Sequence, residues 1–321
     1  MSKIKSIAVK DTDNGIRLDR WVRKHFPVIP YGLLQKLVRT GQVRIDGRRV
    51  KADQRVSTGE YIRIPPFQIY NNDISKGINQ PISDNYRCSQ LQNSVIYKDE
   101  ELLILNKPPG LAVQGGTKVR EHLDGYLEAL RFNSPERPRL VHRLDKDTSG
   151  VLVLARNADA SRWLSRAFRN RNTQKLYWAI VVGVPKNNVG TIDNALEKGI
   201  SNAKEKMKPT QGPNGQKAKT FYRVIRSAVP SVSWLALQPF TGRTHQLRVH
   251  AADVLMTPIL GDRKYGGTNA ILDTNFISNH LHLHSREIKI TAPNGRCIEA
   301  SATLPKHMIS TFKYFGFKEE H

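Results

Sequence analysis

Cysteine is scarce in this chain of 321 residues, which contains only Cys88 and Cys297. Two cysteines so far apart match neither a disulfide framework nor the ligand spacing of a zinc site. They are typical of free thiols in a reducing compartment. The sequence therefore excludes a small secreted domain that is held together by disulfide bonds.

Long apolar runs are absent as well. No segment approaches the roughly 20 apolar residues that a membrane-spanning helix needs. The opening residues, Met1–Lys5, lead into no apolar stretch of the kind found in a secretory signal peptide. We therefore expect a cytoplasmic protein without a membrane anchor. Nothing in the sequence indicates an obligate interface, so we expect a monomer.

Acidic residues are few in comparison with basic ones, because 28 Asp and Glu stand against 51 Lys and Arg. The formal net charge of +23 and the pI of about 10.1 indicate a polyanionic partner, and nucleic acid is the first candidate. A membrane surface is the weaker alternative. The length is sufficient for two domains or one large domain with a buried core.

Residues 1–66 have the pattern of a compact unit of helices and short strands. The spacing of apolar residues predicts one helix over about 17–26 and a second over about 31–40. Asp46-Gly47 predicts a hairpin turn between two short strands, and a third strand is expected at 61–64.

This N-terminal unit is also strongly basic, with 15 Lys and Arg against 6 Asp and Glu. Acids are few on the second predicted helix and the hairpin, so a merely solvated charged face fits less well than a nucleic-acid contact surface. The candidate contacts are Lys36, Arg39, Arg44, Arg48 and Arg49.

Two segments of the unit, Ile16–Trp21 and Leu37–Val50, resemble the small RNA-binding domain of the ribosomal-protein-S-four type. The resemblance covers nearly the whole unit. It implies a paired-helix-plus-β domain that supplies a second RNA contact beside the remainder of the chain.

Residues 67–93 are dominated by Asn, Ser, Asp and Gln, and this composition predicts a linker. The remainder, 94–321, alternates short strands with a few helices. Strands are expected at 102–105, 176–182, 220–225, 234–237 and 288–290, and helices at 121–131 and 158–170. Because strands outnumber helices without a βαβ rhythm, we expect an α+β domain on a mixed, mainly antiparallel sheet.

The segment His142–Gly150 concentrates ionisable side chains between two apolar strands. Asp145 and Asp147 could hold a magnesium ion, act as a general acid and base, or supply a nucleophile. Arg143 and Lys146 flank them. Cations so close lower carboxylate pKa values and compete with a metal, which favours a metal-free, ionised carboxylate.

Two further clusters could join this segment. Lys175 and Tyr177 share one face of a strand with period two, where a tyrosine is most often packing but can also stack on a base. From Arg243 we expect a helix with His245 and Arg248 on one face, and these cations suit an anion. The buried stripe of that helix is expected to be Leu247, Ala251 and Val254.

The clusters together resemble the RluA family of pseudouridine synthases, in particular its RluC-like branch. The family's His-Arg-Leu-Asp turn is matched by His142–Gly150, and its Lys-x-Tyr-x-Ala strand by Lys175–Ala179. Its Gly-Arg-Thr-His-Gln-Leu-Arg helix is matched by Gly242–Arg248, and its Lys-Pro-x-Gly loop by Lys107–Val113. The motifs occur in the expected order and spacing.

The resemblance implies an isomerase that needs neither metal nor cofactor and acts on RNA, with 23S ribosomal RNA the first candidate and tRNA the second. Asp145 would be the catalytic carboxylate, Tyr177 would stack on the base and relay a proton, and Arg248 would pair with Asp145. Leu247 would form an apolar wall of the pocket beside the uracil. Further substrate contacts would come from Arg143, Lys175, Arg243 and His245.

Two other interpretations remain open. The alternating His280-Leu281-His282-Leu283-His284 could line one strand face and, with Asp145 and Asp147, form a metal-dependent nuclease site, although a polar strand face is the commoner explanation. The chain could also be a non-catalytic RNA-binding or ribosome-assembly protein.

Overall fold

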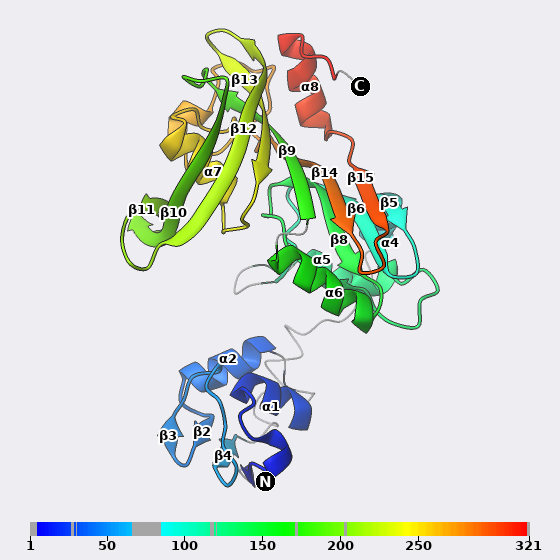
Figure 1. The fold of residues 1–321 in the computed structure, drawn as a ribbon, viewed down its shortest axis with the longest axis vertical. Helices are drawn as coiled ribbons and strands as arrows, with labels where there is room; N and C mark the ends of the chain where they lie inside the picture. Colours follow the sequence, from blue (N-terminus) through cyan, green and yellow to red (C-terminus); the bar gives the residue numbers. More distant parts are fainter. Residues whose placement is uncertain are drawn as a thin grey trace. The chain divides into compact units, whose positions relative to one another are not determined.

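The chain divides into two compact units, Met1–Gln80 and Pro81–His321 (Figure 1). None of the described helices is long and apolar enough to cross a membrane. The computed structural model describes residues 5–26, 29, 31–65, 85–115, 119, 121–170, 173–201 and 204–319.

The first unit packs two helices on a small antiparallel sheet with strand order β1-β4-β2-β3. Leu18 and Trp21 of the first helix and Leu34 of the second are fully buried in its core. The predicted helices, hairpin and third strand are confirmed. The elements are β1 (Lys5–Ala8), η1 (Asp11–Asp13), α1 (Leu18–His25), α2 (Tyr31–Arg39), β2 (Arg44–Ile45), β3 (Arg48–Arg49) and β4 (Tyr61–Ile64).

The second unit is built on one long sheet with the strand order β11-β10-β12-β13-β9-β14-β8-β6-β5, to which β15 and β7 add at β14 and β8. Among the described strands only β14 and β8 pair in parallel, so the predicted α+β fold on a mixed, mainly antiparallel sheet is confirmed. Its strands are β5 (Val95–Lys98), β6 (Leu102–Lys107), β7 (Arg139–Leu140), β8 (Ser149–Ala155), β9 (Thr173–Val182), β10 (Val189–Ser201), β11 (Lys204–Thr210), β12 (Gln216–Ala228), β13 (Val232–Pro239), β14 (Leu283–Thr291) and β15 (Cys297–Ser301).

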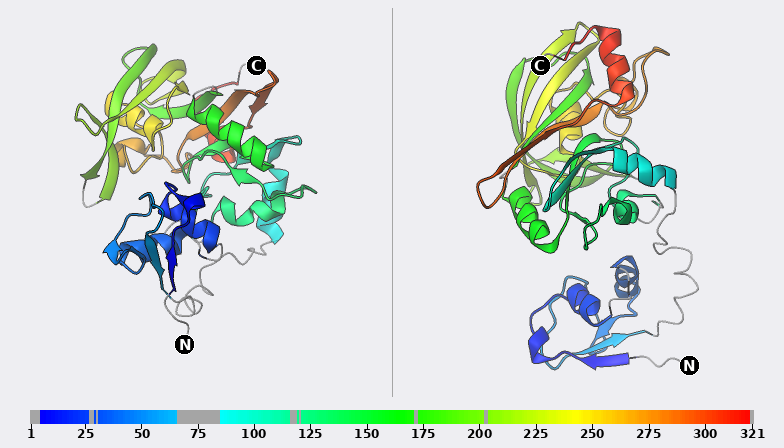
Figure 2. Two further views of the ribbon diagram at one scale, coloured as in Figure 1. Left: turned by 60° about the horizontal axis from the view of Figure 1, so that its bottom comes forward. Right: turned by 90° about the vertical axis from the view of Figure 1, so that its right-hand side faces the viewer.

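Helices cover both faces of this sheet. Around β6 and β8, one face packs against α4, α5 and η2, and the other against α6 (Figure 2). Around β9 and β13, α7 covers one face and α8 the other. The helical elements are α4 (Asn85–Asn93), α5 (Leu123–Tyr126), η2 (Leu127–Leu130), α6 (Ala158–Arg169), α7 (Gln246–Val249), η3 (His250–Val254), η4 (Gly267–Ala270) and α8 (Lys306–Phe315).

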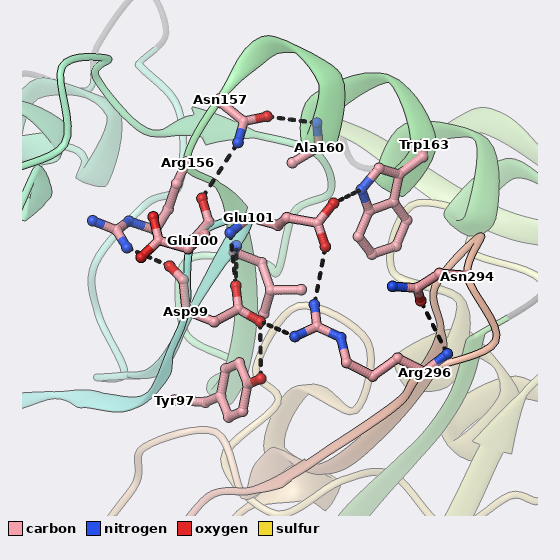
Figure 3. A network of polar contacts seen from close by, with 11 residues as sticks. Tyr97, Asp99, Glu100, Glu101, Arg156, Asn157, Ala160, Trp163, Asn294 and Arg296 are labelled. Carbon is pink, nitrogen blue, oxygen red and sulfur yellow. Dashed lines mark hydrogen bonds and ion pairs between the residues drawn. The ribbon is translucent and has the colours of Figure 1, made fainter.

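A polar network fixes the start of α6 against the strand ends (Figure 3). Arg296, in the turn between β14 and β15, bridges Asp99 and Glu101 at 2.9 and 3.0 Å. Glu101 also accepts the indole N–H of Trp163 on α6 at 3.1 Å, and Asn157 caps the helix. The network therefore holds α6, whose far end reaches the cavity described below.

Two sequence-based predictions need correction. The prediction of a linker over residues 67–93 is wrong for its C-terminal part. Residues 85–93 form α4, and Leu91 is fully buried in the core of the second unit. Residues 67–84 lie outside the described residues. The helix predicted over 121–131 is broken into α5 and the 3-10 turn η2.

Three buried histidines should make the second unit sensitive to acid. Burial lowers the pKa of His250 and His284 to about 4 and that of His282 to about 3. Below about pH 6.5 the unfolded chain binds protons that the folded chain does not, so the free energy of unfolding should fall by up to about 1.4 kcal/mol per pH unit for each histidine. The loss should continue to about pH 3–4.

Urea unfolding between pH 7.5 and 5 measures this effect. His282→Gln should flatten the slope of the free energy of unfolding against pH. His280→Gln, the same change at an exposed position two residues earlier, should leave that slope unchanged. Equal slopes in the two variants would contradict the assignment.

Candidate active site

A cavity of about 550 Å³ opens where the two halves of the large sheet meet. Tyr177, on the central strand β9, packs against the apolar cores of both halves, so the cavity lies at their junction. The cavity is lined by residues far apart in the sequence: 142–145 and Thr148, Phe168 and Arg169, Lys175 and Tyr177, 239–248, and Leu283. The three predicted clusters therefore meet in one place.

Asp145 stands in a tight turn that enters the cavity. The backbone N–H of Thr148 donates to the carbonyl of Asp145 at 3.2 Å, and the buried Leu144 anchors the turn in the core. Gly150 follows with a φ of +104°, and a Cβ there would come within 2.1 Å of the Ser285 carbonyl on β14. Only glycine lets β14 approach this closely.

A fully buried lysine, Lys107, is hydrogen-bonded to the same turn. Lys107 Nζ donates to the carbonyls of Pro108, Leu111 and Lys146 at 2.7, 2.9 and 3.1 Å. Burial lowers the pKa of Lys107 to about 7, although the negative charges of Asp147 and Asp145 act to raise it. The Lys-Pro-x-Gly motif thus ties its own loop to the turn that carries Asp145.

Arg248 reaches Asp145 but has a stronger partner. Its Nη1 lies 3.6 Å from Asp145 Oδ2, while Nε and Nη2 donate to both oxygens of the fully buried Asp262 at 2.8 and 2.7 Å. Burial acts to lower the pKa of Arg248, but Asp262, and then Asp145, raise it above its ordinary value. The predicted pairing with Asp145 is therefore present, with Asp262 holding the guanidinium in place.

The segment around Arg243 differs from the predicted helix. His245 has a left-handed φ of 53°, and α7 begins only at Gln246. The buried Gln246 side chain accepts from Thr241 Oγ1 and from the N–H of Arg243 at 2.7 and 3.1 Å, which fixes this entry. A π-helical turn follows, and its wider period moves Val254 to the surface at 39% exposure, so its predicted burial is wrong.

Tyr177 contributes a phenol that stays protonated. Burial raises the pKa of Tyr177 to about 12. Ser285 lies directly opposite on β14, and its hydrogen bond to the Tyr177 hydroxyl acts to lower that pKa. A phenol of this pKa is a poor general base near pH 7, because only about one molecule in 10⁵ is ionised. The ring, in contrast, presents an apolar surface to the cavity.

The other predicted contacts lie around the cavity. Leu247 lines it as a buried apolar wall, His245 lies 3.8 Å from Asp145, and Arg143, Lys175 and Arg243 also line it. Arg169, at the end of α6, adds a cation that the sequence did not single out.

The five basic residues predicted as contacts in the N-terminal unit lie on α2, β2 and β3, and all but the half-buried Arg44 are exposed. Arg44 stands directly opposite Arg49 on one side and Arg63 on the other. Like charges at opposed positions of a sheet destabilise it unless an anion neutralises them. Arg63 therefore extends the predicted basic surface.

The nuclease interpretation lacks support in this geometry. Asp147 is exposed and does not line the cavity. His282 contacts the His280 carbonyl and Thr311 Oγ1 at 2.8 Å each, and His284 contacts Ser149 Oγ and the Ala302 carbonyl at 2.8 and 3.1 Å. The ring nitrogens of both histidines are thus engaged within the protein.

Sequence reasoning missed Asp262 and the buried role of Lys107. Asp262 follows the apolar pair Ile259-Leu260 inside a glycine-flanked loop, and an isolated acid in that setting is a signal for a buried ion pair. Its partner lies 14 residues earlier, and only the fold brings the two together.

Comparison with known proteins agrees with the geometry. Residues 101–253 match the family model of RNA pseudouridylate synthase, and residues 16–62 match the S4 domain. A solved structure, human RNA pseudouridylate synthase domain containing 4, superposes with a TM-score of 0.60 at 29% identity, over 72% of this chain and 96% of that one.

Sequence relatives extend the match along nearly the whole chain. Ribosomal large subunit pseudouridine synthase C of Vibrio vulnificus is 35% identical over 295 residues, which cover 91% of this chain and 90% of the relative. RNA pseudouridine synthase 4, mitochondrial, of Arabidopsis thaliana is 35% identical over 84% of this chain and 70% of the relative. This chain belongs to the RNA pseudouridylate synthase family and carries an N-terminal S4 domain.

Proposed function

We propose that this enzyme converts specific uridines of large-subunit (23S) ribosomal RNA into pseudouridine, with Asp145 as the catalytic carboxylate. One observation carries the role of Asp145: among the described residues that line the cavity, it is the only carboxylate, and cations surround it. The ribosomal substrate is suggested by the names of relatives such as the Vibrio vulnificus protein.

The reaction detaches uracil from the ribose at nitrogen 1 and rejoins it through carbon 5, so it neither consumes nor releases another molecule. Asp145 would attack the nucleotide or stabilise its positive charge, with Arg248 as its charged neighbour at 3.6 Å. A target base must first leave its stack, which costs a few kcal/mol, and phosphate contacts to basic residues would supply that energy.

The proposed reaction can be tested with RNA that carries tritium at carbon 5 of uridine, since forming the new bond releases it. Purified protein should release tritium from a 23S transcript in the presence of EDTA. Release from tRNA alone would contradict the proposed substrate. No release from either RNA would contradict the proposed reaction, and dependence on a divalent ion would point back to metal chemistry.

Tyr177 should matter first through its ring and then through its hydroxyl. Tyr177→Phe keeps the stacking surface but removes the proton donor, so kcat should fall by about 10²-fold with KM little changed. Tyr177→Leu should raise KM as well. Tyr222→Phe, the same change at another buried tyrosine of the unit, is the control and should stay near wild type.

The basic surface of the S4 domain should contribute to affinity through phosphate contacts. Replacing Arg48 and Arg49 by Gln should weaken RNA binding and reduce the slope of log K against log salt by up to about 2. Lys289→Gln removes a cation already paired with Glu299 and is the control. Unchanged slopes in the double variant would argue against this surface.

We also propose that the enzyme acts as a monomer in the cytoplasm. The proposal rests on the sequence, in which nothing indicates an obligate interface. Sedimentation at micromolar concentration, with and without RNA, tests the monomer.

A further inference from the structure

His245 holds a position beside the catalytic carboxylate that is fixed from its far side. Its Nε2 faces Asp145 Oδ2 at 3.8 Å, and its Nδ1 lies 2.7 Å from the hydroxyl of Tyr265. The left-handed backbone at His245 and the α7 entry hold the ring between these two groups. About one fifth of its side chain is exposed, toward a cavity that it lines.

The proton positions follow from the partners of Tyr265. The backbone N–H of Met207 donates to the Tyr265 hydroxyl oxygen at 3.3 Å. A phenol has one proton, and this geometry lets it point at His245 Nδ1, which then accepts it. The neutral imidazole then carries its own proton on Nε2, facing the cavity.

A protonated ring would disturb this arrangement, because Nδ1–H would face the hydroxyl and force its proton away. The surroundings also favour the neutral ring. Burial lowers the pKa of His245, and the positive charges of Arg248 and Lys264 lower it further. The negative charges of Asp145 and Asp262 act to raise it, but the pKa remains below its ordinary value. The 3.8 Å gap to Asp145 exceeds a hydrogen bond, and no described residue accepts the Nε2–H.

We propose that His245 is a neutral hydrogen-bond donor to an acceptor oxygen of the bound nucleotide, and that Tyr265 is a positioning residue that fixes its tautomer. This inference rests on the proposed function, because the acceptor is a uracil carbonyl or a ribose hydroxyl of the target uridine. The uracil carbonyl and the ribose hydroxyl both offer an oxygen lone pair, and both belong to the nucleotide on which Asp145 would act.

The tautomer can be read directly by ¹⁵N NMR of histidine-labelled protein, with the His245 signals assigned from their loss in His245→Gln. In the wild type, Nδ1 should be unprotonated and Nε2 should carry the hydrogen. In Tyr265→Phe, which keeps the ring 5.1 Å from the Arg248 guanidinium but loses the hydroxyl, the two tautomers should mix. A wild-type Nδ1–H would overturn the proposal.

Turnover tests the donor. His245→Leu should lower kcat/KM by about 10-fold to 100-fold, since one hydrogen bond in the pocket is lost. His245→Gln places an amide N–H near the former Nε2 and should recover most of that loss. Both variants bear the same left-handed backbone cost, so backbone strain cannot separate them. Equal losses in Gln and Leu would overturn the donor role.

A target uridine lacking the 2′-hydroxyl distinguishes the two acceptors. If the ribose oxygen is the partner, wild type and His245→Leu should become equal on this substrate; if a uracil carbonyl is, their ratio should persist. The NMR readout is independent of catalysis. A protein with the expected tautomer but no tritium release would therefore contradict the proposed function alone.

Discussion

Asp145→Asn is expected to reduce tritium release by about 10⁴-fold or more while RNA binding stays within about threefold of wild type. The amide has nearly the shape of the carboxylate but no charge and little nucleophilicity. Arg248 keeps its bidentate bonds to Asp262 in this variant, so the pocket should retain its geometry. The measurements are single-turnover tritium release and filter binding of the same RNA.

Asp147→Asn is the matched control, because it makes the same change two residues further on. Asp147 is exposed and lies outside the cavity lining, so this variant should keep its activity within about threefold. If Asp145→Asn released tritium at the wild-type rate, or if Asp147→Asn were the inactive variant, the assignment of the catalytic carboxylate would be wrong.

Asp262→Asn should lower both stability and activity. Asp262 is fully buried, and Arg248 is 8% exposed, so removing one charge leaves the other inside the protein without its main partner. Breaking a buried pair in this way costs about 3–5 kcal/mol of the free energy of unfolding. Catalysis should fall as well, because Arg248 would no longer be held at a fixed distance from Asp145.

Urea denaturation and tritium release measure the two effects. Asp253→Asn changes an exposed carboxylate of the neighbouring π-helical turn and should shift the free energy of unfolding by less than about 0.5 kcal/mol. A loss below about 1 kcal/mol in Asp262→Asn would show that Asp262 does not anchor the guanidinium.

Local patterns predicted much of the architecture. Helical spacing around Leu18 and Leu34 predicted α1 and α2, Asp46-Gly47 predicted the β2–β3 turn, and the period of two around Tyr177 predicted β9. These features depend on neighbours within a few residues, which the sequence contains directly.

The features that escaped prediction depend on distant partners. The polar segment 85–93 forms α4 because Leu91 enters a core that β6 shares with β8, and β8 begins only at Ser149. The widened turn after α7 has no local sequence signature, and it displaced Val254 from the buried face. The three motifs were each visible, but their meeting in one cavity follows only from the order of strands in the sheet.

That strand order also sets when the enzyme can first work. β14 lies between β9 and β8, and its Ser285 stands opposite Tyr177 on one side and Gly150 on the other. During synthesis, the chain has made both of those strands long before residue 285 exists. We therefore expect the halves that carry Asp145 and Tyr177 to come together only after β14 has emerged, and we expect a nascent chain on the ribosome to be inactive until it is nearly complete.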